Sequence, residues 1–148
     1  MKKTFLLLFT VVAISGFAAD KGLQVKDLPA AVQKTVQDQT KGAEIKNIAK
    51  ETEKGVTQYE VETLVAGKHR DFNVDAKGGL VVVEEEVAID SIPVAAKASI
   101  QKKVADGKLG MVETVTKGSV TLYEAAFTSK AGKKGAILVK ADGTETKD

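Results

Sequence analysis

A repeat within the chain constrains its fold more than any other feature. When the sequence is shifted by 64 residues, the 33 positions of 28–60 align with 92–124 without a gap. Background composition would give about two identical pairs in such an alignment. There are eight: Pro29/Pro93, Ala31/Ala95, Gln37/Gln101, Thr52/Thr116, Val56/Val120, Thr57/Thr121, Tyr59/Tyr123 and Glu60/Glu124. The chain is therefore predicted to fold as two copies of one unit.

The aligned pairs that are not identical also support a repeat. Leu28 aligns with Ile92, and other pairs also exchange one aliphatic residue for another, which is how core positions vary. After one inserted residue, the match resumes at a shift of 65, where Phe72 aligns with Ile137. We infer a duplication, with a first repeat at 23–87 and a second at 88–148.

Each repeat is predicted to open with a helix. Asp27 and Ser91 can each accept a hydrogen bond from a free backbone N–H of the first turn, where a proline follows at no cost. Apolar residues then recur every four positions and give each helix one apolar stripe that a sheet would cover. The stripes are Leu28, Val32 and Val36 in the first repeat, and Ile92, Ala96, Ile100 and Val104 in the second.

The remainder of each repeat has the alternation of half-buried strands. Tyr59 and Val61 alternate with Glu60 and Glu62, so the tyrosine is expected to point inward and the glutamates outward. Glycines at 67 and 132 mark hairpin turns, and the apolar run 80–83 is expected near a sheet edge. The predicted fold class is α+β, with two tandem units that each pack a helix on an antiparallel sheet of about four strands.

The first residues predict export. Lys2 and Lys3 precede the apolar run 5–14, and small residues follow, as in a secretory signal peptide; we place it at 1–18. Its apolar part is too short to span a bilayer, and the chain has no cysteine to carry a lipid at the cleavage site. A periplasmic or secreted protein without a membrane span is expected. Without the two lysines, 20 basic residues face 20 acidic ones, which argues against nucleic acid as a partner.

No pattern of catalytic or metal-binding residues is found. The absence of cysteine excludes thiolate chemistry and Cys-bound metals, and His69 is the only histidine. Three adjacent strand residues such as Glu84, Glu85 and Glu86 cannot converge on one cation. The serines lack a nucleophile-elbow setting, and there is no phosphate-binding loop. We therefore expect no enzymatic activity, no metal and no cofactor.

The order of these motifs resembles the PepSY-like family, and more narrowly the exported bacterial domains related to the beta-lactamase inhibitory protein. The matching positions are Leu28-Pro29, Tyr59-Glu60-Val61, Gly67-Lys68 and Asp75 to Gly78, with Ile92-Pro93, Tyr123-Glu124 and Gly132-Lys133 in the second repeat. The resemblance implies a helix on a four-stranded antiparallel sheet, often in tandem, that binds or restrains peptidases and other envelope proteins. No inhibitory residue is carried over, because the matching turns hold Ala-Gly-Lys.

Two functional hypotheses follow. The first is an exported, non-catalytic protein that binds or inhibits a peptidase or another envelope or secreted protein. Its contacts are expected where the repeats diverge, at Lys68, His69, Arg70, Lys133 and Lys134. The alternative is a periplasmic protein that binds a small molecule or a cation through the outward residues Glu60, Glu62, Glu84 and Glu86. The sequence leaves the oligomeric state open.

Overall fold

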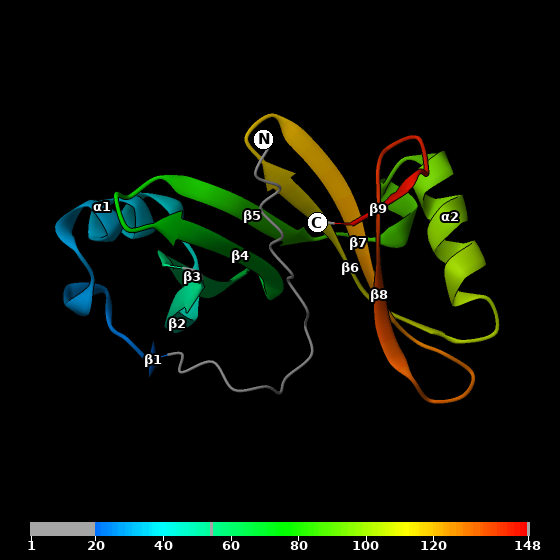
Figure 1. Cartoon of the computed structure of the whole chain (residues 1–148), viewed down its shortest axis with the longest axis horizontal. Helices are drawn as coiled ribbons and strands as arrows, with labels where there is room; N and C mark the ends of the chain where they lie inside the picture. Colours follow the sequence, from blue (N-terminus) through cyan, green and yellow to red (C-terminus); the bar gives the residue numbers. More distant parts are fainter. Residues whose placement is uncertain (1–19, 54, 148) are drawn as a thin grey trace. The chain divides into compact units, whose positions relative to one another are not determined.

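A computed structural model describes residues 20–53 and 55–147 (Figure 1). In this part of the chain, nine strands form one sheet whose order in space is the order in sequence, β1 to β9. The strands are β1 (Asp20–Lys21), β2 (Glu44–Glu53), β3 (Val56–Val65), β4 (Lys68–Asp75), β5 (Leu80–Glu86), β6 (Lys108–Lys117), β7 (Val120–Thr128), β8 (Lys134–Val139) and β9 (Glu145–Thr146). The helices are α1 (Ala30–Gln39) and α2 (Val94–Val104), preceded by the 3-10 turns η1 (Val25–Asp27) and η2 (Ile89–Ser91).

The predicted fold class is wrong. The strands do not divide into two four-stranded sheets with a helix each; they follow one another in a single sheet, and the protein is mostly β with two short helices. The run 80–83 is also not an edge, because β5 stands between β4 and β6 in the strand order. Val82 in the middle of this run is 1% exposed.

By proximity of its residues, the described chain separates into two compact units. The first comprises 20–86 and 114–120, and the second 87–113 and 121–147. The repeats predicted at 23–87 and 88–148 differ from these units, because residues 114–120 group with the first. The duplication stays a prediction, and the signal peptide predicted at 1–18 lies outside the described residues.

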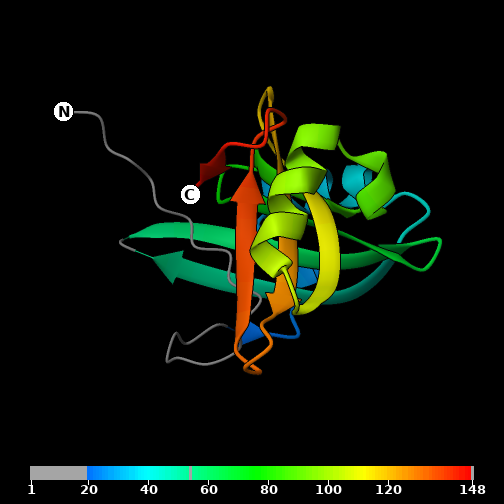
Figure 2. The same cartoon turned by 90° about the vertical axis from the view of Figure 1, so that its right-hand side faces the viewer.

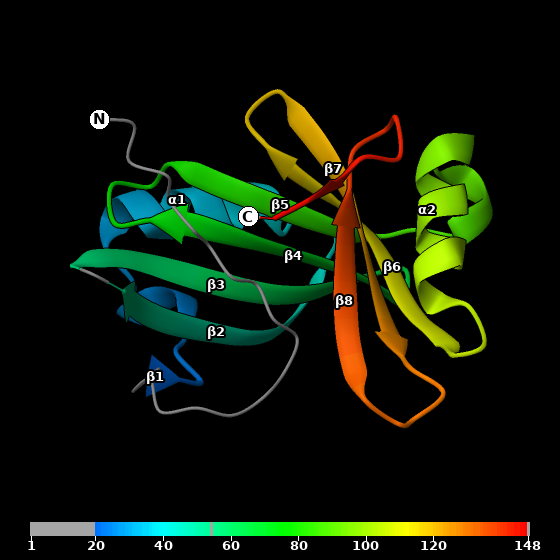
Figure 3. The same ribbon diagram turned by 45° about the vertical axis from the view of Figure 1, so that its right-hand side comes forward.

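In the first unit, α1 packs on β4, and neighbouring strands pair in antiparallel fashion (Figure 3). The apolar stripe of α1 enters the core as predicted, and Tyr59 points inward with it. Buried side chains from the helix, from the segment just before it and from three strands form this first core: Leu28, Val32, Val36, Ile48, Tyr59, Val61, Phe72 and Val74.

In the second unit, α2 packs on β8 (Figure 2). Its core is built from smaller side chains, with half-buried Tyr123 and Phe127 packed around it. The buried members of this second core are Ile92, Ala96, Ile100, Val112, Ala125, Ile137 and Val139.

The helices begin later than predicted. Pro29 and Pro93 are the N-cap residues of α1 and α2, and neither helix has a side-chain cap. Asp27 instead accepts a hydrogen bond from the N–H of Gln24 at 2.9 Å within η1, and the Ser91 hydroxyl donates to the carbonyl of Ala88 within η2. The reason is that the residue before each proline is held in extended backbone, which separates the 3-10 turn from the helix.

Candidate functional site

Three of the predicted contact residues lie on the β3–β4 hairpin. Ala66 and Gly67 form its two-residue turn with φ values of +52° and +81°, the left-handed backbone that such tight turns require. Lys68 follows as the first residue of β4 and is exposed. His69 and Arg70 come next on the same strand, so the sequence order brings all three predicted residues to one end of the hairpin.

Arg70 is held within the first unit. Its guanidinium donates to the carbonyl of Gln39 at 3.2 Å, to the side-chain oxygen of Gln39 at 2.8 Å and to Glu85 Oε1 at 3.1 Å. It also lies 5.7 Å from the centre of the Phe72 ring, a cation–π distance. Only 22% of the side chain is exposed. These contacts connect β4 with the end of α1 and with β5, which is a structural role.

The β3–β4 ladder is interrupted beside Arg70. Strand pairing is in register at Val61 with Phe72 and resumes at Leu64 with His69. Between these pairs the N–H of Thr63 donates to Asp71 Oδ1 at 2.8 Å, and the Thr63 hydroxyl donates to the carbonyl of Arg70. A carboxylate therefore replaces a backbone partner in the middle of the sheet.

Asp71 is the carboxyl group that accepts the Thr63 N–H at this interruption. Burial raises the pKa of the Asp71 carboxyl above its ordinary value, and the neighbouring Glu62 acts in the same direction. The Thr63 N–H and His69, whose Nδ1 is 3.8 Å from Asp71 Oδ2, lower that pKa and partly offset the effect of burial. The backbone N–H of His69 donates to Glu86 Oε2 at 3.1 Å.

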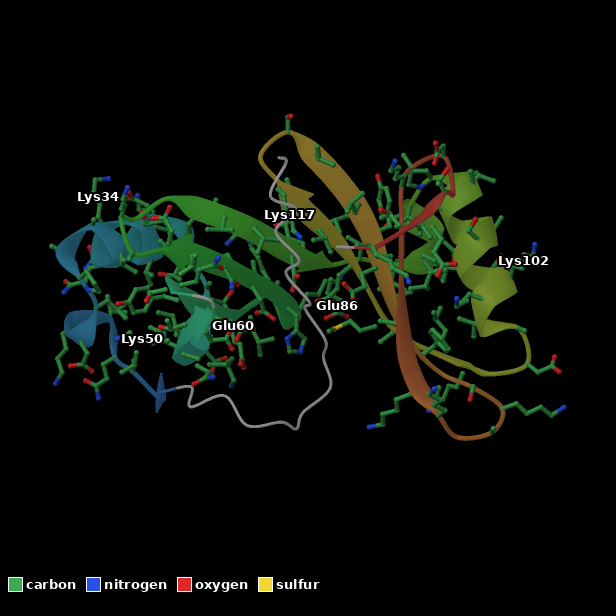
Figure 4. All side chains as sticks on the ribbon, in the orientation of Figure 1. Lys34, Lys50, Glu60, Glu86, Lys102 and Lys117 are labelled. Atoms are coloured by element: carbon green, nitrogen blue, oxygen red, sulfur yellow. The ribbon has the colours of Figure 1, made fainter. Side chains whose placement is uncertain are left out.

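The four glutamates of the alternative hypothesis do not form a metal centre. Glu60 and Glu86, labelled in Figure 4, lie on β3 and at the end of β5. Glu62 accepts a hydrogen bond from Asn47 at 3.1 Å, and Glu86 accepts one from His69. Within residues 20–53 and 55–147, no group of three or more acidic, histidine or cysteine side chains is arranged to hold a metal ion.

The other two predicted residues, Lys133 and Lys134, lie on the β7–β8 hairpin of the second unit. Ser129 and Lys133 close its turn, with the N–H of Ser129 donating to the Lys133 carbonyl at 2.8 Å. The lysine side chains are exposed, as is that of Lys130 in the same turn. Lys130 lies 3.6 Å from Asp106, and both side chains are at least 80% exposed, so this ion pair is weak.

The five predicted residues are thus divided between two hairpins. Lys68, His69 and Arg70 belong to the first unit, while Lys133 and Lys134 belong to the second. Sequence reasoning missed Lys130, which lies in the same basic turn, and it missed Asp71. The alignment of the repeats could have identified Asp71, because a shift of 65 aligns this charged residue with Ala136 in the second repeat.

Comparison with known proteins identifies the fold. No family model and no curated protein matches the sequence. The structure is similar to a candidate periplasmic protein of Bacteroides eggerthii, with a TM-score of 0.65, 16% identity, and coverage of 81% of this chain and 86% of that one. It is also similar to a DUF2874 family protein of Bacteroides uniformis, with a TM-score of 0.65, 17% identity, and coverage of 80% and 86%.

A third solved structure gives the fold a more specific description. It is a BLIP-like protein of Bacteroides fragilis, with a TM-score of 0.59, 17% identity, and coverage of 80% of this chain and 83% of that one. The chain has the fold of these proteins. In its described part, no helix has the length and apolar character needed to cross a membrane.

Proposed function

We propose that this chain is an exported, non-catalytic protein that binds another envelope or secreted protein, with a peptidase as the first class of target to test. Export would use the signal peptide predicted at 1–18. The fold shared with a BLIP-like protein and with a candidate periplasmic protein supports the proposal. So does the PepSY-like resemblance of the sequence, which we retain as a proposed relationship.

One observation supports the proposal most directly. The turn of the β7–β8 hairpin presents Lys130, Lys133 and Lys134 to solvent. Neither Lys133 nor Lys134 has an ion pair with the described residues, so a partner would not have to displace an internal contact. Charged groups of this kind speed encounter with an oppositely charged surface and select among partners. We therefore assign the contact surface to this turn, and we treat Lys68, which belongs to the other unit, as a separate candidate contact.

The remaining predicted residues contribute differently. Arg70 is committed to Gln39 and Glu85, and a partner that used its guanidinium would have to break those bonds. We propose that Arg70 holds the β3–β4 hairpin in place through these bonds. The side chain of His69 is 49% exposed and lies on the solvent side of the same hairpin. A direct contribution of Arg70 to affinity is expected to be smaller than that of Lys133 or Lys134.

The test compares charge variants in affinity capture from an envelope extract. The mature chain is used as bait beside Lys133→Glu/Lys134→Glu, and Lys77→Glu/Lys102→Glu, at two exposed lysines away from the β7–β8 hairpin, serves as the matched control with the same change of charge. A protein captured by the mature chain and by the control, but lost with the Lys133 variant, is the expected result. Capture that is equal for all three, or no reproducible capture, would contradict the proposal. Calcium titration by calorimetry tests the alternative, for which we expect no heat of binding.

A further inference from the structure

Strand β8 has a strand on both sides along only part of its length. Every residue from Lys134 to Val139 pairs with β7, from Thr128 opposite Lys134 to Tyr123 opposite Val139. On its other side, β9 pairs only with Leu138 and Val139. Within the described residues, 134–137 therefore have no strand partner on the β9 side (Figure 2).

The open side carries backbone groups that point outward. The N–H of Lys140 donates to the carbonyl of Thr144 at 3.0 Å, so the backbone of Lys140 faces the β9 side. In an antiparallel strand, both backbone groups of a residue point to one neighbour, and successive residues alternate. Lys134 and Ala136 have the same parity as Lys140 and are both exposed. Among residues 20–53 and 55–147, no strand pairs with the two N–H and two C=O groups of Lys134 and Ala136.

The charges around this edge indicate what can fill it. The segment 128–140 contains Lys130, Lys133, Lys134 and Lys140 and no aspartate or glutamate. Lysines on an edge strand oppose pairing with a second copy of the same edge, because like charges would face each other. They favour a strand with acidic side chains, because opposite charges would then face each other. Gly135 and Ala136 lie between the lysines and offer little steric obstruction.

We propose that residues 134–137 of β8 bind an extended acidic segment of another protein, which adds to the sheet as a further strand next to the end of β9. This inference rests on the proposed binding function and specifies its mode. Backbone hydrogen bonds to Lys134 and Ala136 supply affinity, and the lysines select acidic side chains, as in other cases of strand addition. A folded acidic surface without a free strand is not a ligand of this edge.

The first experiment uses a defined probe. A synthetic peptide of alternating glutamate and valine is titrated into the isotope-labelled mature chain, and amide hydrogen exchange is followed by NMR. In the free protein, the amides of Lys134 and Ala136 should exchange readily, because they face solvent. With the peptide bound, we expect both to slow by at least about tenfold while the amides of 135 and 137, which face β7, change little. Absence of binding, or protection elsewhere only, overturns the proposal.

Two matched peptides separate strand addition from simple charge attraction. The first has the same sequence with alternate backbone nitrogens methylated, which removes donors and blocks pairing without changing charge. We expect its affinity to fall by at least about tenfold, a loss of about 1.4 kcal/mol. The second replaces glutamate with lysine and should not bind. Equal binding of the methylated peptide would show that the lysines act only as a charged patch and would overturn strand addition.

A pair of protein variants completes the test. Ala136→Pro removes one outward N–H without removing a bond to β7, and edge positions tolerate proline. Ala136→Thr keeps the N–H and is the control. We expect the proline variant alone to lose the glutamate peptide, with the thermal unfolding midpoints of both variants compared to verify folding. If capture of a partner still depends on Lys133 and Lys134 but the peptides do not bind, strand addition fails and the proposed function stands.

Discussion

The β3–β4 and β7–β8 hairpins occupy aligned positions in the sequence, but different contacts stabilise them. In the first, the hydroxyl of Thr63 donates to the carbonyl of Arg70. In the second, Phe127 and Gly135 face each other across β7 and β8. There the aromatic ring covers the glycine so closely that an added Cβ would lie 2.9 Å from Phe127 Cζ.

This difference has consequences for the surface. The polar arrangement comes with Arg70, whose side chain reaches back to α1 and β5 and is largely covered. The apolar arrangement needs no charged residue, and the lysines of the second hairpin remain directed at solvent. One hairpin therefore uses its charge for internal stability, and the other keeps its charge available for a partner.

The cores beneath the hairpins are closely matched. At all eight aligned positions, both residues are in a core or packed against it. The side chains of the second core are larger at one of these positions, Val36/Ile100, and smaller at four: Val32/Ala96, Ile48/Val112, Val61/Ala125 and Phe72/Ile137. Conserved placement with reduced volume predicts that equivalent substitutions will have unequal effects in the two units.

The largest effect is expected for truncation of the aromatic core residue. Phe72 is 1% exposed, and Phe72→Ala should lower the free energy of unfolding by about 3–5 kcal/mol through lost burial and a residual cavity. Ile137→Ala at the aligned position should cost about 2–4 kcal/mol. Urea denaturation of both variants measures the difference. A loss for Ile137→Ala that equals or exceeds that for Phe72→Ala would show that core volume does not distinguish the units.

Two glycines, one in each unit, lie close to the backbone of a helix, and their substitution is expected to have the same effect in both units. Gly78 and Gly143 have φ values of +86° and +83°, and an added Cβ would lie 2.6 Å from the carbonyl oxygen of Ala31 or Ala95. Gly78→Ala and Gly143→Ala should therefore each destabilise the protein by about 2–4 kcal/mol, from steric overlap and backbone strain together.

Gly132→Ala is the matched control for these glycines. Its φ is +81°, but nothing lies within 4 Å of an added Cβ, so only the strain of about 1 kcal/mol applies. The free energies of unfolding of the three variants are compared under one set of conditions. Equal losses in all three would mean that contact with the helix backbone contributes nothing at Gly78 and Gly143.

A smaller effect is expected for the charged residues of the two hairpins. Arg70→Ala removes bonds to Gln39 and Glu85 and should cost about 1–2 kcal/mol, given partial exposure of the group. Lys134→Ala should change stability by no more than about 0.5 kcal/mol. Thermal and urea unfolding measure both changes. A neutral Arg70→Ala would remove the contrast between an internally bonded hairpin and an exposed one.

Much of the local structure was predictable from the residues. Alternation located β3 and β7, and glycines located the hairpin turns. The joining of all strands into one sheet was not predictable, because an apolar strand such as 80–83 has the same pattern whether it is paired on one side or on both. The late start of the helices was also missed, since the proline rule fixes a boundary only to within a few residues.

The candidate site was predictable only in part. Differences between the aligned repeats identified Lys133 and Lys134. They could also have identified Asp71, which aligns with Ala136 in the second repeat. They could not show that Arg70 reaches Gln39, which is distant in sequence and carries no pattern of its own. Nor could they show that β9 ends after Thr146, because the length of a paired edge depends on contacts rather than composition.

The smallest expected effect concerns the pH dependence of the first hairpin. Because burial raises the pKa of Asp71 in the folded chain, the native state binds more protons than the unfolded state above the ordinary value of 3.8. Stability from this group therefore falls as the pH rises from that value through the folded pKa. Asp71→Asn, which keeps an oxygen for the Thr63 N–H, should remove this decline and leave the protein at least as stable near neutral pH. Ala136→Asn at the aligned position of the second hairpin should leave the pH profile unchanged. Urea unfolding across the acid range measures all three chains, and a decline that persists in Asp71→Asn would assign it to other groups, with Glu62 and His69 the nearest to test.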